Sequence, residues 1–155
     1  MPVDGRGLKV MVVDSDRTVL ELLQIRLDVA GYHACVARDA RSALDMLKMI
    51  RPAALVLELN LPDISGYEFL QSLTARGAKP TFPILVTGRG LAVEDVQRAV
   101  SLGAQTCMLK PFSGGDMLER IGRLLAPRLA AKPPTPEAID QDLRQPAARK
   151  ILLVE

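Results

Sequence analysis

The chain alternates between short apolar runs and amphipathic patterns, and this alternation constrains its fold more than any other feature. Five runs have the character of strands, namely KVMVVD (9–14), YHACVA (32–37), ALVLEL (54–59), PILVTG (83–88) and QTCMLK (105–110). The runs around Met11, Val56 and Leu85 are continuously apolar, which is typical of strands covered on both faces. Regular alternation of strands and helices predicts an α/β fold with a doubly wound parallel sheet and right-handed crossovers.

Apolar residues at helical spacing separate these runs. They include Leu20, Leu23 and Leu27; Ala43, Leu47 and Ile50; Val93, Val96 and Val100; and Leu118, Ile121 and Leu125. Residues suited to helix N-caps precede the helical patterns at Asp16, Asp39, Ser65 and Ser113. Glycines suited to helix ends follow at Gly31, Gly77 and Gly103, and Pro52 is expected to end the second helix.

The candidate functional residues lie where the predicted strands end. In doubly wound sheets, sites form at the carboxyl ends of the strands, where the strand order changes direction. The residues at these positions are Asp14, Ser15, Glu58, Thr87 and Lys110. We therefore expect these five to form one site.

Composition argues against several classes of protein. A net charge of +2 with no basic run gives no reason to expect nucleic acid binding. One histidine and two separated cysteines, Cys35 and Cys107, argue against a zinc site or a disulfide framework and favour small core thiols in a reducing compartment. No stretch has the character of a signal peptide or a membrane span, so the expected location is cytoplasmic and away from membranes.

Several of these segments resemble the receiver domain of two-component response regulators, over roughly residues 8–127. KVMVVDSD is similar to the family's first strand with its acids, and LELNLPDISG is similar to the phosphoacceptor loop, with Pro62 and Gly66 at the family's spacing. ILVTG supplies a hydroxyl-bearing switch residue, and LKPF supplies the family's lysine. The resemblance implies a flavodoxin-like (βα)5 domain over 8–130, with a five-stranded parallel sheet in the order 2-1-3-4-5.

The resemblance also implies roles for individual residues. In the family, an aspartate accepts a phosphoryl group from a phosphohistidine, with Mg²⁺ held by neighbouring acids. The acidic pocket, the phosphoacceptor position, the two switch positions and the phosphate-site lysine correspond here to Asp14, Ser15, Glu58, Thr87, Cys107 and Lys110. The peptide bond before Pro111 is expected to be cis. Any Mg²⁺ would be held weakly, by Asp14, Glu58 and Asn60.

Two positions depart from the family and predict a pseudo-receiver. Glu58 replaces the acceptor aspartate, and its carboxylate extends about 1.5 Å further, which disfavours chemistry that depends on positioning. Ser15 replaces a metal-binding acid, and a neutral hydroxyl is a poorer ligand for a hard cation. We therefore expect no regular phosphotransfer at Glu58. Instead, an ion pair between Glu58 and Lys110 is expected to imitate part of the phosphorylated state or to lock one conformation.

The expected function is signalling by protein contact, without enzymatic activity. Two further departures, Cys107 in place of the family's aromatic and Gly88 in place of its alanine, make the usual switch coupling doubtful. The expected contact surface comprises the fourth and fifth helices and the last strand. Its polar side chains are Glu94, Asp95, Arg98, Asp116, Glu119, Arg120 and Arg123. The expected partners are other domains of a multidomain response regulator or hybrid kinase, or a second copy of this chain.

The residues leave two other functions open. The first is a Mg²⁺-dependent phosphoacceptor that uses Glu58 or a nearby acid such as Asp63, which would take up phosphate from a small donor. The second is a flavodoxin-like domain that binds an anionic small molecule at the strand ends without any kinase.

The composition changes after the fifth helical pattern. Four prolines within a polar stretch predict a linker over 131–148. The final residues RKILLVE, 149–155, are similar to LKVMVVD at 8–14. We therefore expect 149–155 to be the first strand of a second receiver domain, which would itself be a partner.

Overall fold

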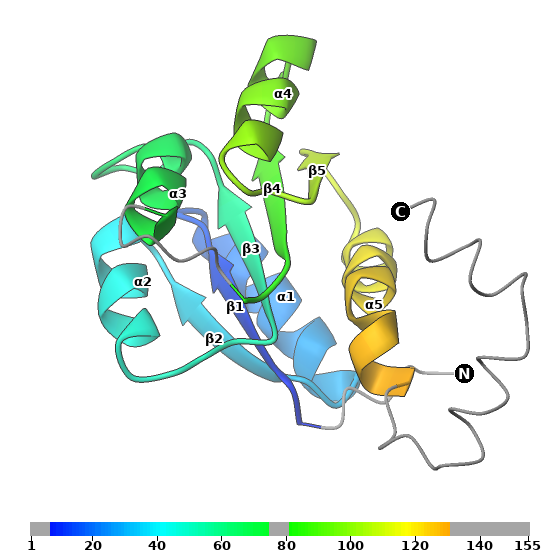
Figure 1. Cartoon of the computed structure of the whole chain (residues 1–155). Coiled ribbons are helices and arrows are strands. Elements are labelled where there is room, and N and C mark those ends of the chain that lie inside the picture. The colour runs from blue at the N-terminus through cyan, green and yellow to red at the C-terminus, as the bar shows by residue number, and fades with distance from the viewer. Residues whose placement is uncertain (1–6, 75–80, 131–155) are drawn as a thin grey trace, which may run out of the picture.

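A computed structural model describes residues 7–74 and 81–130, and within them strands and helices alternate as the sequence predicts (Figure 1). The elements are β1 (Lys9–Val13), α1 (Arg17–Val29), β2 (His33–Ala37), α2 (Ala40–Leu47), β3 (Ala54–Glu58), α3 (Gly66–Thr74), β4 (Ile84–Gly88), α4 (Val93–Ser101), β5 (Thr106–Leu109) and α5 (Gly114–Ala130). The strands form one parallel sheet in the order β2-β1-β3-β4-β5, so the flavodoxin-like fold is confirmed. The expected linker at 131–148, the strand at 149–155 and Gly77 lie outside the described residues.

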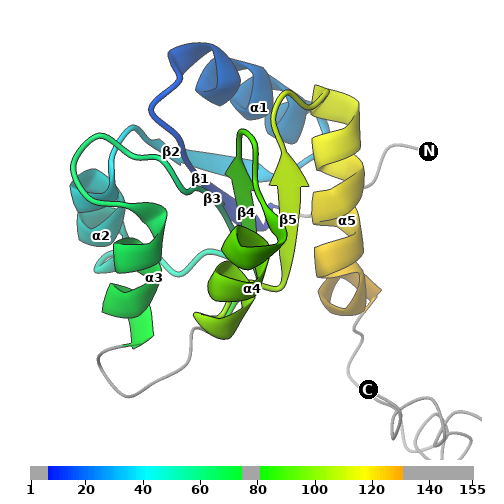
Figure 2. The same ribbon diagram turned by 90° about the horizontal axis from the view of Figure 1, so that it is seen from above.

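Helices cover both faces of the sheet (Figure 2). One face packs against α1 and α5, and the other against α2, α3 and α4. The central strands β1, β3 and β4 are almost fully buried, whereas the edge strands β2 and β5 are mostly half-buried. This difference explains why the continuously apolar runs belong to the central strands.

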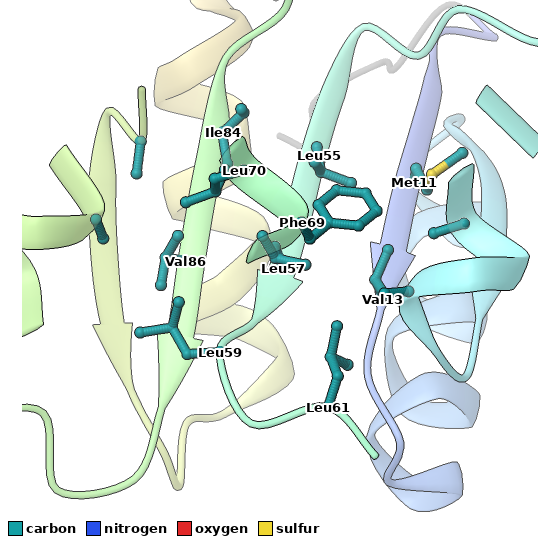
Figure 3. Close-up of a cluster of buried hydrophobic side chains, with 14 of the residues drawn as sticks. Met11, Val13, Leu55, Leu57, Leu59, Leu61, Phe69, Leu70, Ile84 and Val86 are labelled. Carbon is teal, nitrogen blue, oxygen red and sulfur yellow. The ribbon is translucent and has the colours of Figure 1, made fainter. Parts of the chain in front are cut away.

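Side chains along each strand alternate between two cores. The core under α2 and α3, drawn in Figure 3, takes from the strands Met11, Val13, Leu55, Leu57, Ile84 and Val86. The core under α1 and α5 takes Val10, Val12, Ala54, Val56 and Leu85. The two-residue period of a strand assigns the polar residues that follow, Asp14, Glu58 and Thr87, to the face of α1 and α5.

The predicted helix caps are present. The side chains of Asp16, Asp39, Ser65 and Ser113 accept hydrogen bonds from backbone N–H groups in the first turns of α1, α2, α3 and α5. The prediction that Pro52 ends the second helix is wrong, because α2 already ends at Leu47. The chain leaves the helix early and turns back, so that the N–H of Ala53 can donate to the carbonyl of Lys9 at 2.7 Å, beside the start of β1.

Gly66 starts α3 in close contact with the backbone that follows β3. Its N–H donates to the carbonyl of Leu59 at 2.8 Å. A Cβ atom at this position would lie 2.7 Å from the Cα of Leu59 and 2.9 Å from the carbonyl oxygen of Glu58. A side chain at position 66 would therefore push the first turn of α3 away from the residue at the phosphoacceptor position.

We expect Gly66→Ala to lower the free energy of unfolding by about 1–3 kcal/mol, because the backbone at Leu59 and Glu58 must move to admit the methyl group. The measurement is denaturant unfolding followed by circular dichroism. Gly115→Ala is the matched control, because the nearest atom to its new Cβ is 4.0 Å away. An equal loss in both variants would show that the contact at Gly66 is not responsible.

Candidate functional site

The register of the sheet brings four polar residues to one edge. Glu58 and Thr87 are direct cross-strand partners, and Thr87 is paired in turn with Met108, two residues before Lys110. Val13 is paired with Leu57, so Asp14 lies level with Glu58. The predicted strand-end residues Asp14, Glu58, Thr87 and Lys110 therefore meet on the face covered by α1 and α5.

Lys110 and Thr87 both contact the same carboxylate oxygen of Glu58. The Thr87 hydroxyl donates to Glu58 Oε2 at 2.9 Å, and Lys110 Nζ lies 3.3 Å from that oxygen. The expected ion pair between Glu58 and Lys110 is thus present. Asp14, Glu58 and Thr87 are the buried polar or charged residues of the described chain, and the Lys110 side chain is only 7% exposed. Water screens these interactions little, because the groups are buried.

The nearest partner of Lys110 is Asp14, which the sequence placed in the same site but did not predict to pair with Lys110. Lys110 Nζ lies 2.6 Å from Asp14 Oδ2, closer than it lies to Glu58. The other oxygen of Asp14 accepts a hydrogen bond from the N–H of Asp16 at 2.8 Å, the local turn that aspartate favours. The Asp-x-Asp spacing was the available signal for this turn. The ammonium group is therefore shared by two fixed carboxylates.

Within the described residues, the remaining predicted site residues form no side-chain hydrogen bond or ion pair with the Asp14–Glu58–Lys110 cluster. Ser15 and Asn60 are exposed, and neither side chain has a hydrogen bond within 7–74 and 81–130. Cys107 is half-buried on β5 and packs against the core under α2 and α3, on the other face of the sheet from Lys110. The Lys110–Pro111 peptide bond is cis, as the resemblance implied.

Asp63 contacts the N-terminus of α2. Its two carboxylate oxygens accept hydrogen bonds from the N–H groups of Ala40 at 3.1 Å and Arg41 at 2.9 Å. Desolvation acts to raise the pKa of Asp63, but the backbone N–H groups, those of Arg41 and Ala40 first among them, hold this pKa below its ordinary value. Asp63 therefore joins the loop after β3 to α2, a long-range contact with no signal in the sequence.

The residues at the strand ends do not fit a resident divalent cation. Mg²⁺ requires several oxygen ligands in near-octahedral geometry. In the described part of the chain, no group of three or more His, Cys, Asp or Glu side chains could hold a metal ion. Asp14 and Glu58 already face the ammonium group of Lys110, and Ser15 contributes a neutral, exposed hydroxyl.

The expected contact surface carries fewer available polar groups than the sequence suggested. Asp95 and Arg98 of α4 both contact Tyr67 of α3, through a hydrogen bond of 3.2 Å and a cation–π contact of 4.1 Å respectively. On α5, Arg120 donates to Thr106 of β5 at 2.9 Å, and Arg123 pairs with Glu119. Asp95, Arg98 and Arg120 are engaged because α4 packs beside α3 and α5 beside β5. Glu119 and Arg123 pair within α5 and remain exposed.

Between α4 and β5 lies an apolar groove of about 420 Å³, which we call the α4–β5 groove. It is lined by Leu91, Val96, Val100, Gln105, Thr106, Cys107, Met108 and Leu109. The lining side chains of Val100 and Leu109 are exposed. None of the described helices is both long and apolar enough to cross a membrane.

The sheet order, together with the acids, the threonine and the lysine at its edge, defines a domain of the flavodoxin-like class used in two-component signalling. The chain belongs to the response regulator receiver domain family, whose family model matches residues 10–122. The resemblance drawn from four short motifs is thereby confirmed.

Known proteins similar to the chain agree with this assignment. The chain is 36% identical over 119 residues to the response regulator MprA of Mycobacterium tuberculosis, a match that covers 77% of this chain and 51% of that protein. It is 35% identical over 118 residues to MprA of Mycolicibacterium vanbaalenii, a match that covers 76% of this chain and 50% of that protein. The chain thus spans about half the length of these curated relatives.

Solved structures give the same result. The chemotaxis response regulator CheY4 of Vibrio cholerae has a TM-score of 0.71 and 27% identity, with 76% of this chain and 98% of that one covered. The BeF3-activated DrrB receiver domain has a TM-score of 0.68 and 25% identity, with 77% and 97% covered.

We expect Lys110→Met to lower the free energy of unfolding by about 3–5 kcal/mol, because it leaves two buried carboxylates without a cation. Lys48→Met is the matched control, since Lys48 pairs with Asp45 at 3.5 Å on the surface and its loss should change stability by about 0.5 kcal/mol or less. Denaturant unfolding of the two variants makes the comparison. Similar small losses would mean that the buried ion pairs contribute nothing net.

We expect the stability difference between the natural chain and Asp63→Asn to depend on pH. The folded-state pKa of Asp63 lies below its ordinary value of 3.8, so its contribution is complete above that value and is lost as the pH falls through the lower folded-state pKa. The natural chain should therefore be the more stable at pH 7, and the difference should shrink below about pH 4. Unfolding midpoints between pH 7 and pH 2.5 measure it, and a constant difference would contradict the assignment.

Proposed function

We propose that this chain is a pseudo-receiver, a signalling module that works by protein contact and does not accept phosphate at the usual position. One observation carries the proposal: a single oxygen of Glu58 contacts both the Thr87 hydroxyl and the Lys110 ammonium group. In receiver domains these two groups hold the oxygens of the transferred phosphoryl group. In this chain the carboxylate of Glu58 itself takes up both contacts.

The burial of Glu58 supports this proposal. The residue is 5% exposed, and Oε2 is engaged by a hydrogen bond and an ion pair. A carboxylate nucleophile must be accessible to the phosphodonor and in line with its leaving group, and the loss of about 1 Å in positioning lowers rates on the order of a hundredfold. Glu58 would have to give up both contacts before Oε2 could attack.

The charges at the site also favour a permanent internal ion pair. Two carboxylates and one ammonium group leave the cluster with less negative charge than a site that retains both acids of the first strand. The neutral Ser15 further reduces the attraction for Mg²⁺, which stabilises developing charge in phosphoryl transfer. The cluster therefore holds one arrangement of Thr87 and Lys110 without a cofactor.

The surface proposed for protein contact contains the α4–β5 groove. Val100 and Leu109 are its exposed aliphatic side chains, and Val93, seven residues before Val100 on the same helix, is also exposed. Apolar side chains gathered on one face are typical of surfaces that bind another protein. The proposed partners are another domain of a larger response regulator or hybrid kinase, or a second copy of this chain.

We expect the natural chain to gain no phosphoryl group from acetyl phosphate and Mg²⁺, because its carboxylate is engaged and its metal site has lost an acid. We expect the variant Glu58→Asp/Ser15→Asp to gain one. Intact mass spectrometry measures both proteins under the same conditions, and circular dichroism checks that both are folded.

The matched controls are the two single substitutions and Asp63→Asn. Phosphorylation of the natural chain would overturn the proposal, and Asp63→Asn with peptide mapping would then distinguish Glu58 from Asp63 as the acceptor. If neither protein gains a phosphoryl group, Glu58 and Ser15 are not by themselves what prevents the reaction, and the attribution to these two residues alone fails.

A further inference from the structure

Tyr67 makes two contacts with α4 from the first turn of α3. Its hydroxyl donates to Asp95 Oδ1 at 3.2 Å, and the guanidinium carbon of Arg98 lies 4.1 Å from the centre of its ring. The other oxygen of Asp95 accepts a hydrogen bond from the N–H of Ala92 at 2.8 Å, which caps α4. One tyrosine thus contacts both the cap and the next turn of this helix.

Few side chains of α4 itself are buried. Its buried residue is Ala99, while Val93 and Val100 are exposed. Its closest helix neighbour is α3, beside which it lies in Figure 2, and in Figure 1 it extends away from the rest of the molecule. The hydrogen bond and the cation–π contact of Tyr67 therefore position α4 together with Ala99 and the flanking Leu91 and Leu102, which pack against the core.

The backbone links Tyr67 closely to the site. Gly66, directly before it, contacts Leu59 and Glu58 so tightly that a Cβ atom would not fit. The N–H of Leu59 donates to the carbonyl of Thr87 at 3.0 Å, and the N–H of Gly66 donates to the carbonyl of Leu59 at 2.8 Å. A movement of the backbone at Glu58 or Thr87 should therefore displace the first turn of α3, because Gly66 packs directly against the backbone of Glu58 and Leu59.

The residue that the resemblance assigns to this coupling is absent. The family's aromatic on the last strand corresponds to Cys107, whose thiol is too small to link the site to α4. Tyr67 and Cys107 both pack against the core under α2 and α3, so an aromatic ring is still present beside α4, supplied by α3. Burial, and then the hydrogen bond to Asp95, raise the pKa of Tyr67, so the hydroxyl keeps its proton and remains a donor at neutral pH.

We propose that Tyr67 is a positioning residue that fixes α4 and transmits to it the state of the Glu58–Thr87–Lys110 cluster, in place of an aromatic on β5. The proposal goes beyond the function proposed above, because it concerns how the site and α4 are linked, whether or not Glu58 accepts phosphate. It assigns the coupling to two contacts, Tyr67 with Asp95 and Tyr67 with Arg98.

The test is amide hydrogen exchange of α4 in the full chain, compared with α1 as an internal reference for overall stability. Four proteins form a cycle: the natural chain, Tyr67→Phe, Glu58→Gln and the double variant. Tyr67→Phe should speed exchange in α4 about fivefold relative to α1, the factor given by losing one hydrogen bond of ordinary net strength. Glu58→Gln should speed it several-fold in the natural chain and less than about twofold when combined with Tyr67→Phe.

Tyr32→Phe is the matched control, because the buried Tyr32 hydroxyl has no hydrogen-bond partner in the described structure, so its removal should leave α4 unchanged. The proposal is overturned if Tyr67→Phe affects α4 no more than Tyr32→Phe does. It is also overturned if Glu58→Gln leaves α4 unchanged, or speeds exchange equally with and without Tyr67→Phe. These outcomes do not depend on phosphorylation, so they separate this proposal from the pseudo-receiver proposal.

Discussion

The pairing register of β3 with β4 is the constraint on which the site depends. Glu58 lies opposite Thr87, and both belong to the set of alternate residues that faces α1 and α5. A slip of one residue would turn Glu58 toward the core under α2 and α3 and separate it from Thr87. Glu58 itself opposes that slip, because its buried carboxylate would lose Thr87 and Lys110 and enter an apolar core.

The buried ion-pair cluster of Asp14, Glu58 and Lys110 satisfies the charges at the ends of these apolar strands. Asp14 and Glu58 are buried beside one ammonium group, and each carboxylate also accepts a hydrogen bond, from Asp16 and Thr87 respectively. Buried charges are tolerated only when they are paired in this way. The arrangement that stabilises the edge of the sheet also occupies the groups that would otherwise act on a phosphoryl group. The same contacts thus support both the fold and the proposed loss of phosphotransfer.

The ion-pair cluster and α4 lie on opposite faces of the sheet. The cluster lies on the face of α1 and α5, whereas α4, Cys107 and Tyr67 belong to the opposite layer. One path from Glu58 to α4 passes around the end of β3, where Gly66 touches the backbone of Glu58 and Leu59. Tyr67 follows Gly66 directly and contacts α4 through Asp95 and Arg98. The exposed α4–β5 groove lies beside this helix, so the position of α4 decides the shape of the proposed contact surface.

The sequence by itself determined the local elements and, through them, much of the site. The apolar runs, the caps at Asp16 and Asp39, and strand-end residues such as Glu58 and Lys110 follow from periodicity and residue type. Only the tertiary structure decided that Lys110 lies closer to Asp14, that Asp63 caps α2 and that Tyr67 contacts α4. The physical reason is that strand and helix periods act over neighbouring residues. These contacts instead join segments far apart in the chain, at distances set by how the layers pack.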